Sequence, residues 1–173
     1  ETVSDRDMER LGLLRTPTDA LALVEMPRYD LPRNPGGDAL ALLLDDVQDP
    51  GNLGTIVRLA DWFGIRDVFC SPASADCFNP KVVQATMGAV LRVRVHYTDP
   101  VALLRRAAAG GVPVYGTFLD GEDIYAAELS ATGILVMGNE GNGIGPDVAE
   151  QIARRLYIPP FPAAVPTSES LNV

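Results

Sequence analysis

The stretch GILVMGNEGNGIGPDVAEQI, residues 133–152, passes from apolar residues through a glycine-rich turn into a helical pattern. The apolar run at its start predicts a strand, while Pro146 and Asp147 are typical of the first turn of a helix. We expect that helix to extend over residues 145–156. A strand joined to a helix by a short turn is the repeating unit of a parallel α/β sheet.

The same alternation of strand and helix continues toward the N-terminus. Further strands are expected in ALALLLD (39–45), RDVFC (66–70), RVRVHY (92–97) and VPVYGTFL (112–119). Helices are expected in residues 52–64, 79–91 and 99–111, with Asn52, Asn79 and Asp99 as N-caps. The pattern predicts an α/β fold with a mainly parallel sheet flanked by helices. Ligands of such sheets bind beyond the carboxyl ends of the strands, here in the loops after Leu44, Val114 and Met137.

Composition excludes several classes of protein. Hydrophobic residues make up 47% of the 173 residues, but no apolar run reaches the length of about 20 residues that a membrane span needs. Two cysteines and one histidine are too few for a disulfide framework or a Cys/His zinc site, so we expect reduced thiols, no metal and a cytoplasmic protein. The net charge of −9 argues against broad, non-specific binding of nucleic acid.

Residues 1–37 differ from the rest of the chain. The segment RYDLPRNPGGD (28–38) is rich in proline and glycine and indicates a linker. The preceding TPTDALALVEMP (16–27) is compatible with a helical turn and a strand, but it is too short to form a core of its own. We expect these residues to be the tail of an upstream domain or an arm packed on the main one.

The glycine turn after Met137 does not match the common phosphate-binding patterns. No Lys-Ser/Thr pair follows it, as a P-loop requires, and its glycines at 138, 141, 143 and 145 do not fit G-x-G-x-x-G. Glu140 would also repel a pyrophosphate. One interpretation is a turn that needs glycine only for positive φ. The other is a ligand with a positive centre that the backbone approaches closely.

Two further segments carry polar residues at loop positions. DDVQDPGNLGTIVRLADWFG (45–64) places Asn52 at a helix start and Arg58 six residues later, a pair that could hold a phosphate or could be a cap and a surface residue. IPPFPAAVPTSESLNV (158–173) is rich in proline and then becomes polar from Ser168 to Asn172. By itself it is compatible with a loop before a helix or with a frayed tail.

Taken together and in this order, the three segments resemble the signature motifs of the SpoU (TrmH-like) RNA ribose 2′-O-methyltransferases of the SPOUT superfamily. The resemblance covers residues 38–173, and residues 3–27 resemble the end of the small RNA-binding domain that precedes the methyltransferase domain in many members. It implies an α/β-knot fold with a deep C-terminal trefoil knot. The family continues beyond the position of Val173 into a helix that completes the knot, which we expect to be absent from this chain.

The resemblance also implies S-adenosylmethionine as the cofactor, whose sulfonium cation is compatible with glycines and an acid in one turn. The implied cofactor-binding residues are Thr117, Gly138, Asn139, Glu140, Gly141, Ile158, Ser170 and Leu171. The implied catalytic residues are Asn52, Arg58, Glu140, Ser170 and Asn172. Arg58 is expected either to help deprotonate the ribose hydroxyl or to clamp a phosphate and stabilise the developing alkoxide.

The family further implies a homodimer that methylates structured RNA, with rRNA favoured over tRNA because of the N-terminal remnant. Since the chain is acidic, RNA affinity would come from an upstream domain or from a local arginine patch. Candidates for that patch are Arg92, Arg94, Arg105, Arg106, Arg154 and Arg155. Two alternatives stay open: a non-catalytic RNA-binding relative, and a dinucleotide-dependent Rossmann enzyme, although the first turn lacks the glycine pattern that the latter needs.

Overall fold

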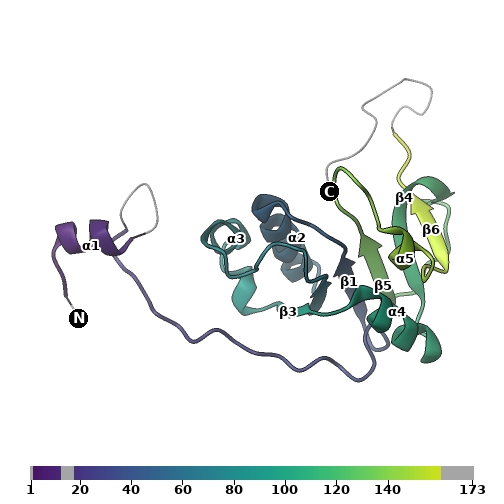
Figure 1. Cartoon of the computed structure of the whole chain (residues 1–173), viewed down its shortest axis with the longest axis horizontal. Coiled ribbons are helices and arrows are strands. Elements are labelled where there is room, and N and C mark those ends of the chain that lie inside the picture. The colour runs from purple at the N-terminus through teal and green to yellow at the C-terminus, as the bar shows by residue number, and fades with distance from the viewer. Residues whose placement is uncertain (1, 13–17, 161–173) are drawn as a thin grey trace.

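The computed structural model describes residues 2–12 and 18–160, and it contains one six-stranded sheet in the order β3-β2-β1-β5-β4-β6 (Figure 1). Every neighbouring pair of strands is parallel. The strands are β1 (Leu40–Leu44), β2 (Asp67–Cys70), β3 (Arg94–Tyr97), β4 (Val114–Asp123), β5 (Gly133–Met137) and β6 (Arg154–Tyr157). The predicted fold class is confirmed, and the central strand β1 lies between β2 and β5 as a strand buried on both faces should.

The helices after β1 connect the strands and cover both faces of the sheet, whereas α1 precedes the sheet. They are α1 (Asp5–Leu11), α2 (Pro50–Trp62), α3 (Pro80–Thr86), the 3₁₀ helix η1 (Ala89–Leu91), α4 (Pro100–Ala109) and α5 (Pro146–Ala149). Asn79 and Asp99 cap α3 and α4 as predicted. The expected cap of α2 was wrong: Asp49 is the N-cap, and its carboxylate accepts a hydrogen bond from the backbone N–H of Asn52. Asn52 therefore lies inside the first turn of α2 and is not its N-cap.

The predicted helix over residues 79–91 is shorter in the structure. α3 ends at Thr86 because Met87 and Gly88 both have positive φ, at 51° and 86°. The chain then continues into η1. On its other side α3 packs closely against α2: a Cβ on Gly54 would lie 2.4 Å from the Cβ of Ala85. A residue larger than glycine at position 54 would force these two helices apart.

The predicted helix over residues 145–156 was wrong beyond its first turn. α5 ends at Ala149, and residues 154–157 form β6, the edge strand that pairs with β4. The apolar residues of the 145–156 segment have a helical spacing. Pairing of residues 154–157 with β4, however, leaves Leu156 only 2% exposed. A tertiary partner thus decides the structure of a segment whose local pattern favours a helix.

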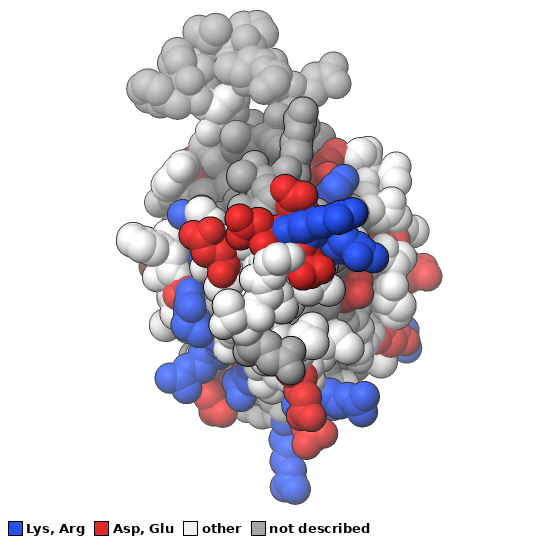
Figure 2. All heavy atoms as spheres, turned by 90° about the vertical axis from the view of Figure 1, so that its left-hand side faces the viewer, with Lys and Arg blue, Asp and Glu red and all other residues white. Residues whose placement is uncertain are grey.

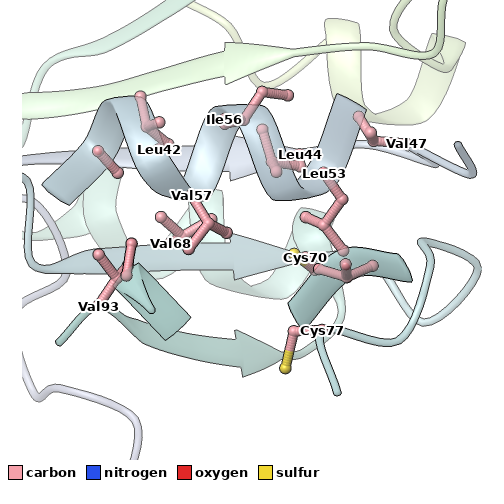
Figure 3. Close-up of a cluster of buried hydrophobic side chains, with 13 residues drawn as sticks. Leu42, Leu44, Val47, Leu53, Ile56, Val57, Val68, Cys70, Cys77 and Val93 are labelled. Atoms are coloured by element: carbon pink, nitrogen blue, oxygen red, sulfur yellow. The ribbon is translucent and has the colours of Figure 1, made fainter. Parts of the chain in front are cut away.

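Two hydrophobic clusters lie on opposite faces of the sheet. Alternate residues of β1 enter each cluster, Leu42 and Leu44 on one face and Ala41 and Leu43 on the other. α2 and α3 cover the first face, and Figure 3 shows Leu53 and the other labelled α2 side chains directed at the strands. α4 and α5 cover the second face. Both cysteines are free thiols buried in the first cluster.

The N-terminal segment lies outside this sheet. α1 buries none of its residues, and Figure 1 shows it apart from the sheet at the end of an extended stretch. Residues 18–31 contain no helix or strand, so the turn and strand expected in 16–27 are absent from the part that is described. The end of the linker packs onto the domain, where the Gly36 carbonyl accepts a hydrogen bond of 2.8 Å from the N–H of Gly133. The division at residue 37 stays a prediction.

The predicted trefoil knot and the final motif depend on residues 161–173, which lie outside the described residues. The knot therefore stays a prediction as well. Within the described ranges, no helix is long and apolar enough to cross a membrane.

Candidate functional site

The loop after β1 and the glycine turn after β5 leave the sheet side by side. Leu44 of β1 is in register with Met137 of β5, and the N–H of Asp45 donates a hydrogen bond of 2.8 Å to the Met137 carbonyl. Parallel pairing therefore brings the first two motifs together, as expected for loops at the carboxyl edge of the sheet.

The glycine turn folds back on itself. Asn139 and Gly143 exchange backbone hydrogen bonds of 3.0 and 2.8 Å, and Gly143 has a φ of 68°. A Cβ on Gly138 would lie 2.2 Å from the carbonyl carbon of Gly143. Gly138 and Gly143 are thus required by the turn itself, the first for close approach and the second for its backbone conformation.

The Asn139 side chain holds this turn to the end of β1. Its Nδ2 donates to the Asp46 carbonyl at 2.9 Å. Its Oδ1 accepts hydrogen bonds from the backbone N–H groups of Gly141 (2.8 Å) and Asn142 (3.1 Å). Because this amide already bridges two loops, Asn139 has an architectural task in addition to the cofactor contact that the resemblance implies.

Glu140 and Asn52 connect the two motifs through their side chains. The amide Nδ2 of Asn52 donates a hydrogen bond to Oε1 of Glu140, across 88 residues of sequence. Asn52 is partly exposed on the first turn of α2, and Glu140 is exposed on the glycine turn. The structure thus brings together two of the predicted catalytic residues at the surface of the carboxyl edge.

Arg58 lies elsewhere on α2. It is six residues beyond Asn52, about 9 Å further along the helix axis, and it is exposed. Its side chain has no hydrogen bond or ion pair within residues 2–12 and 18–160. An arginine left without a carboxylate partner in so acidic a chain is available for an external anion.

Thr117 lies in β4, the strand next to β5, and Ile158 directly follows β6, the strand beyond β4. Thr117 is half-buried on β4, and its hydroxyl donates to the Val136 carbonyl at 3.4 Å, while Ile158 follows β6 and is 40% exposed. Together with Gly138 and Gly141, which follow β5, they belong to three neighbouring strands, β5, β4 and β6. Ser170, Leu171 and Asn172 lie outside the described residues.

Two aspartates support this edge and were not identified as site residues from the sequence. Asp45 is only 6% exposed, and its Oδ2 accepts a hydrogen bond of 2.7 Å from the N–H of Gly145. Burial raises its pKa. Asp46 has a φ of 57°, and Ser71 Oγ donates to its carboxylate at 2.6 Å while accepting from its N–H at 2.9 Å. The signal was the acidic pair directly after a buried strand.

A cavity of about 370 Å³ adjoins the glycine turn on the side of α4 and α5. Asp45, Asp46 and Asp147 line it together with residues 142–146 of the turn. Among the described residues neither Lys nor Arg lines it, so the described lining is acidic. The arrangement disfavours phosphate and is compatible with a neutral or cationic group nearby.

The predicted arginine patch is mostly engaged in ion pairs. Arg92, Arg94, Arg154 and Arg155 pair with Asp61, Asp67, Glu122 and Asp120 respectively. Arg105 and Arg106 donate to Gln151 and to the Pro32 carbonyl. On the face drawn in Figure 2, basic and acidic side chains alternate instead of forming a broad positive surface. Four of the six candidate arginines thus have an acidic partner, and their role in RNA binding stays a prediction.

The single histidine is part of the packing. His96 is 5% exposed, stacks on Phe69 with ring centroids 5.2 Å apart, and places Nε2 2.9 Å from Asp67 Oδ1. Among the residues that the structure describes, no three His, Cys, Asp or Glu side chains are grouped so that they could hold a metal ion.

Comparison with known proteins supports the relation that the motifs indicated. The 23S rRNA (guanosine(2553)-2′-O)-methyltransferase RlmP of Bacillus subtilis is 35% identical over 159 residues, which are 91% of this chain and 61% of that protein. A solved TrmH-family protein from Porphyromonas gingivalis is 47% identical with a TM-score of 0.89, over 100% of this chain and 68% of that one.

The SpoU methyltransferase AviRb of Streptomyces viridochromogenes, solved with the cofactor AdoMet, is 26% identical with a TM-score of 0.83. That similarity covers 99% of this chain and 67% of AviRb. The chain spans less than two thirds of the length of the Bacillus relative. The profile of the SpoU rRNA Methylase family matches residues 39–173, which are most of the sequence, and the chain therefore belongs to the SpoU rRNA Methylase family.

Proposed function

We propose that this protein is an S-adenosylmethionine-dependent methyltransferase that methylates a ribose 2′-hydroxyl of structured RNA, with rRNA as the substrate class. The observation that carries the proposal is the hydrogen bond between Asn52 and Glu140, which joins two family motifs at the carboxyl edge of the sheet. Family membership and the AdoMet bound to AviRb support the choice of cofactor.

The residues at the strand ends suit this cofactor. Thr117, the backbone at Gly138 and Gly141, and Ile158 would hold the adenosine and methionine parts, with Ser170 and Leu171 completing the site. The turn itself contains Glu140 and no basic residue, which fits a sulfonium cation better than a pyrophosphate. When bound, S-adenosylmethionine supplies an electrophilic methyl group. Asn139 acts here by holding the turn in shape.

The protein must make a weak nucleophile react. A ribose hydroxyl needs to be positioned and to lose its proton as the new bond forms. We assign Arg58 to the RNA phosphate next to the target and to the negative charge that develops on the oxygen, since its guanidinium keeps its own proton. Asn52 and Glu140 orient the ribose from the edge of the glycine turn, and Ser170 and Asn172 act with them.

We further propose that two copies form a homodimer through the exposed face of α2. Leu59, Trp62 and Phe63 are 50%, 84% and 72% exposed there. An exposed tryptophan in the last turn of a helix, followed directly by an exposed phenylalanine at the C-cap, is unfavourable in a monomer and typical of the centre of an interface. Arg58 lies on the same exposed face, so a dimer would bring it close to the partner.

RNA affinity would then depend on residues other than the four arginines that are paired with acids. We propose that residues 1–37 are the tail and linker of an N-terminal RNA-binding domain, which α1 and the exposed apolar side chains of residues 21–26 would suit. Unpaired buried thiols are compatible with the cytoplasm, where we place the protein.

The first experiment is calorimetric titration of the full-length protein with S-adenosylmethionine, with NAD as the control ligand. We expect micromolar binding of the methyl donor and none of NAD. Transfer of radiolabelled methyl groups to purified rRNA and tRNA, followed by nuclease digestion, then identifies the RNA and the 2′-O-methylated nucleotide. Binding of neither ligand, or methyl-donor binding without transfer to any RNA, would contradict the proposal.

A further inference from the structure

Strand β4 contains a bulge directly after Thr117. Thr117 and Glu122 are both in register with Leu156 of β6, so residues 118–121 are extra residues on the β4 side. The bulge follows a proposed cofactor-binding residue at the carboxyl edge of the sheet. Such irregularities redirect side chains, and they are frequent next to functional sites.

The first bulge residue, Phe118, folds back over the strand. A Cβ on Gly116 would lie 2.9 Å from Cε2 of Phe118 and 2.6 Å from Cδ1 of Ile152, so the glycine leaves room for both side chains. The guanidinium of Arg155 covers the ring at 3.4 Å from its centroid. Cation–π contact of this kind fixes an aromatic ring and the planar guanidinium together.

Arg155 holds the other half of the bulge as well. Its Nη2 lies 2.5 Å from Asp120 Oδ1, and this hydrogen bond lowers the pKa of Asp120. Gly121 has a φ of 151°, and a Cβ there would lie 2.6 Å from the Arg155 carbonyl oxygen. One residue of β6 therefore contacts three of the four bulge residues. The remaining one, Leu119, is left 71% exposed.

We propose that Arg155 is a positioning residue for the methyl donor: by holding Phe118 and Asp120, it keeps residues 117–121 in the conformation that closes one side of the cofactor site. Leu119 is then presented as an apolar side chain suited to the flat face of adenine. Arg155 itself need not touch the cofactor. This inference rests on the function proposed above.

The preceding residue supplies a matched control. Arg154 also lies on β6, also pairs with an acid of β4, Glu122, and also lies over an aromatic ring, that of Tyr115 at 5.8 Å. It contacts no residue of 118–121 in any described interaction. Arg154→Gln and Arg155→Gln remove the same charge and the same kind of pair, and only the second releases the bulge.

The test is the dissociation constant for S-adenosylmethionine, measured by calorimetry on both variants. We expect Arg155→Gln to weaken binding about fivefold to tenfold, the loss of one cation–π contact and one ion pair, and Arg154→Gln to change it less than about twofold. Arg155→Lys should recover part of the affinity, because it keeps the charge near Asp120 but loses the planar stack. Equal affinities of the two glutamine variants would overturn the inference.

Kinetics separate positioning from general destabilisation. We expect Arg155→Gln to raise the KM for the methyl donor while kcat and the KM for RNA stay unchanged, and both glutamine variants to unfold at similar temperatures. Asp120→Asn removes the ion pair alone and should raise the same KM to a smaller extent. A parallel loss of kcat and thermal stability in both variants would show that Arg155 only supports the fold. Failure of the wild-type protein to bind the methyl donor would instead contradict the proposed function.

Discussion

The two faces of helix α2 make opposite use of apolar side chains. On the inner face, Leu53, Val57 and Ala60 are completely buried against the sheet. On the outer face, Trp62 and Phe63 are 84% and 72% exposed, and Arg58, which has no ion pair among the described residues, lies on the same side of the helix. The inner face accounts for the folding of the domain. The outer face adds little to the buried core, and its composition suits the dimer interface proposed above.

This difference separates stability from function along one helix. Substitutions on the inner face should change the free energy of unfolding, and substitutions on the outer face should change catalysis and association without unfolding the domain.

The largest effect is expected at Arg58. Arg58→Ala should lower kcat/KM for RNA methylation about 1,000-fold, or about 4 kcal/mol, because a charge that stabilises the transition state is lost. Affinity for S-adenosylmethionine should stay within a few-fold. Arg66→Ala, at another exposed arginine, is the control and should leave activity near that of the wild type. Equal losses of activity and cofactor affinity at Arg58 would indicate a structural role.

On the inner face, Leu53→Ala should destabilise the domain by about 3 kcal/mol, because it leaves a cavity between α2 and β1 that the neighbours cannot fill. Leu91→Ala removes the same atoms from a side chain that is 59% exposed and should cost less than about 0.5 kcal/mol. Urea unfolding monitored by circular dichroism measures both. Similar losses at the two leucines would mean that α2 is not anchored by this face.

Trp62→Ala should weaken the proposed dimer about 30-fold, or about 2 kcal/mol, as truncation of a central interface tryptophan does. The dimer dissociation constant is measured by sedimentation equilibrium. Tyr125→Ala is the control. Tyr125 is 81% exposed and follows β4, which lies near the β6 edge of the sheet. A wild-type protein that is monomeric at micromolar concentration would refute this use of the outer face.

A smaller effect is expected at Asp45, an ionisable residue that is only 6% exposed. Its folded-state pKa is raised above the usual value of 3.8 by burial, so the native state binds the proton more tightly than the unfolded state. Protonation of Asp45 therefore stabilises the folded state fully below the pKa that Asp45 has in the unfolded chain. This stabilisation is lost as the pH rises through the pKa that Asp45 has in the folded protein. Asp45→Asn mimics the protonated form and can still accept from Gly145.

The unfolding free energy of Asp45→Asn should therefore rise relative to that of the wild type as the pH increases above the usual carboxyl pKa of 3.8. Urea unfolding at several pH values gives this difference directly. A difference that stays constant across the range would show that Asp45 titrates alike in the folded and unfolded chains.

The sequence predicts an element correctly where its apolar spacing matches the residues that the element buries. The apolar run of β1, the caps of α3 and α4, and the spacing of α2 were all readable because each element buries the residues that its own period predicts. The cap of α2 was missed because Asp49 and Asn52 are both good caps, and Pro50 at the first helical position is the signal that selects the former.

For the site, the motifs identified Asn52 and Glu140 but not the bond between them. They also did not reveal that Asn139 bridges two loops or that Asp46 needs Ser71 to hold a positive φ. These are contacts between residues 25 to 93 positions apart, and no local pattern encodes them. Four arginines considered for RNA binding were paired with acids for the same reason.

The sequence by itself determined that strands and helices alternate, that the sheet is parallel, and that three polar motifs of one family follow its strands, because periodicity, caps and glycine positions act over a few residues. The tertiary structure decided that residues 154–157 are an edge strand, that residues 118–121 leave the ladder, and that α2 keeps one face exposed. Those outcomes depend on which distant segment supplies a hydrogen-bonding partner or buries a surface, and that competition is settled only when the whole chain has folded.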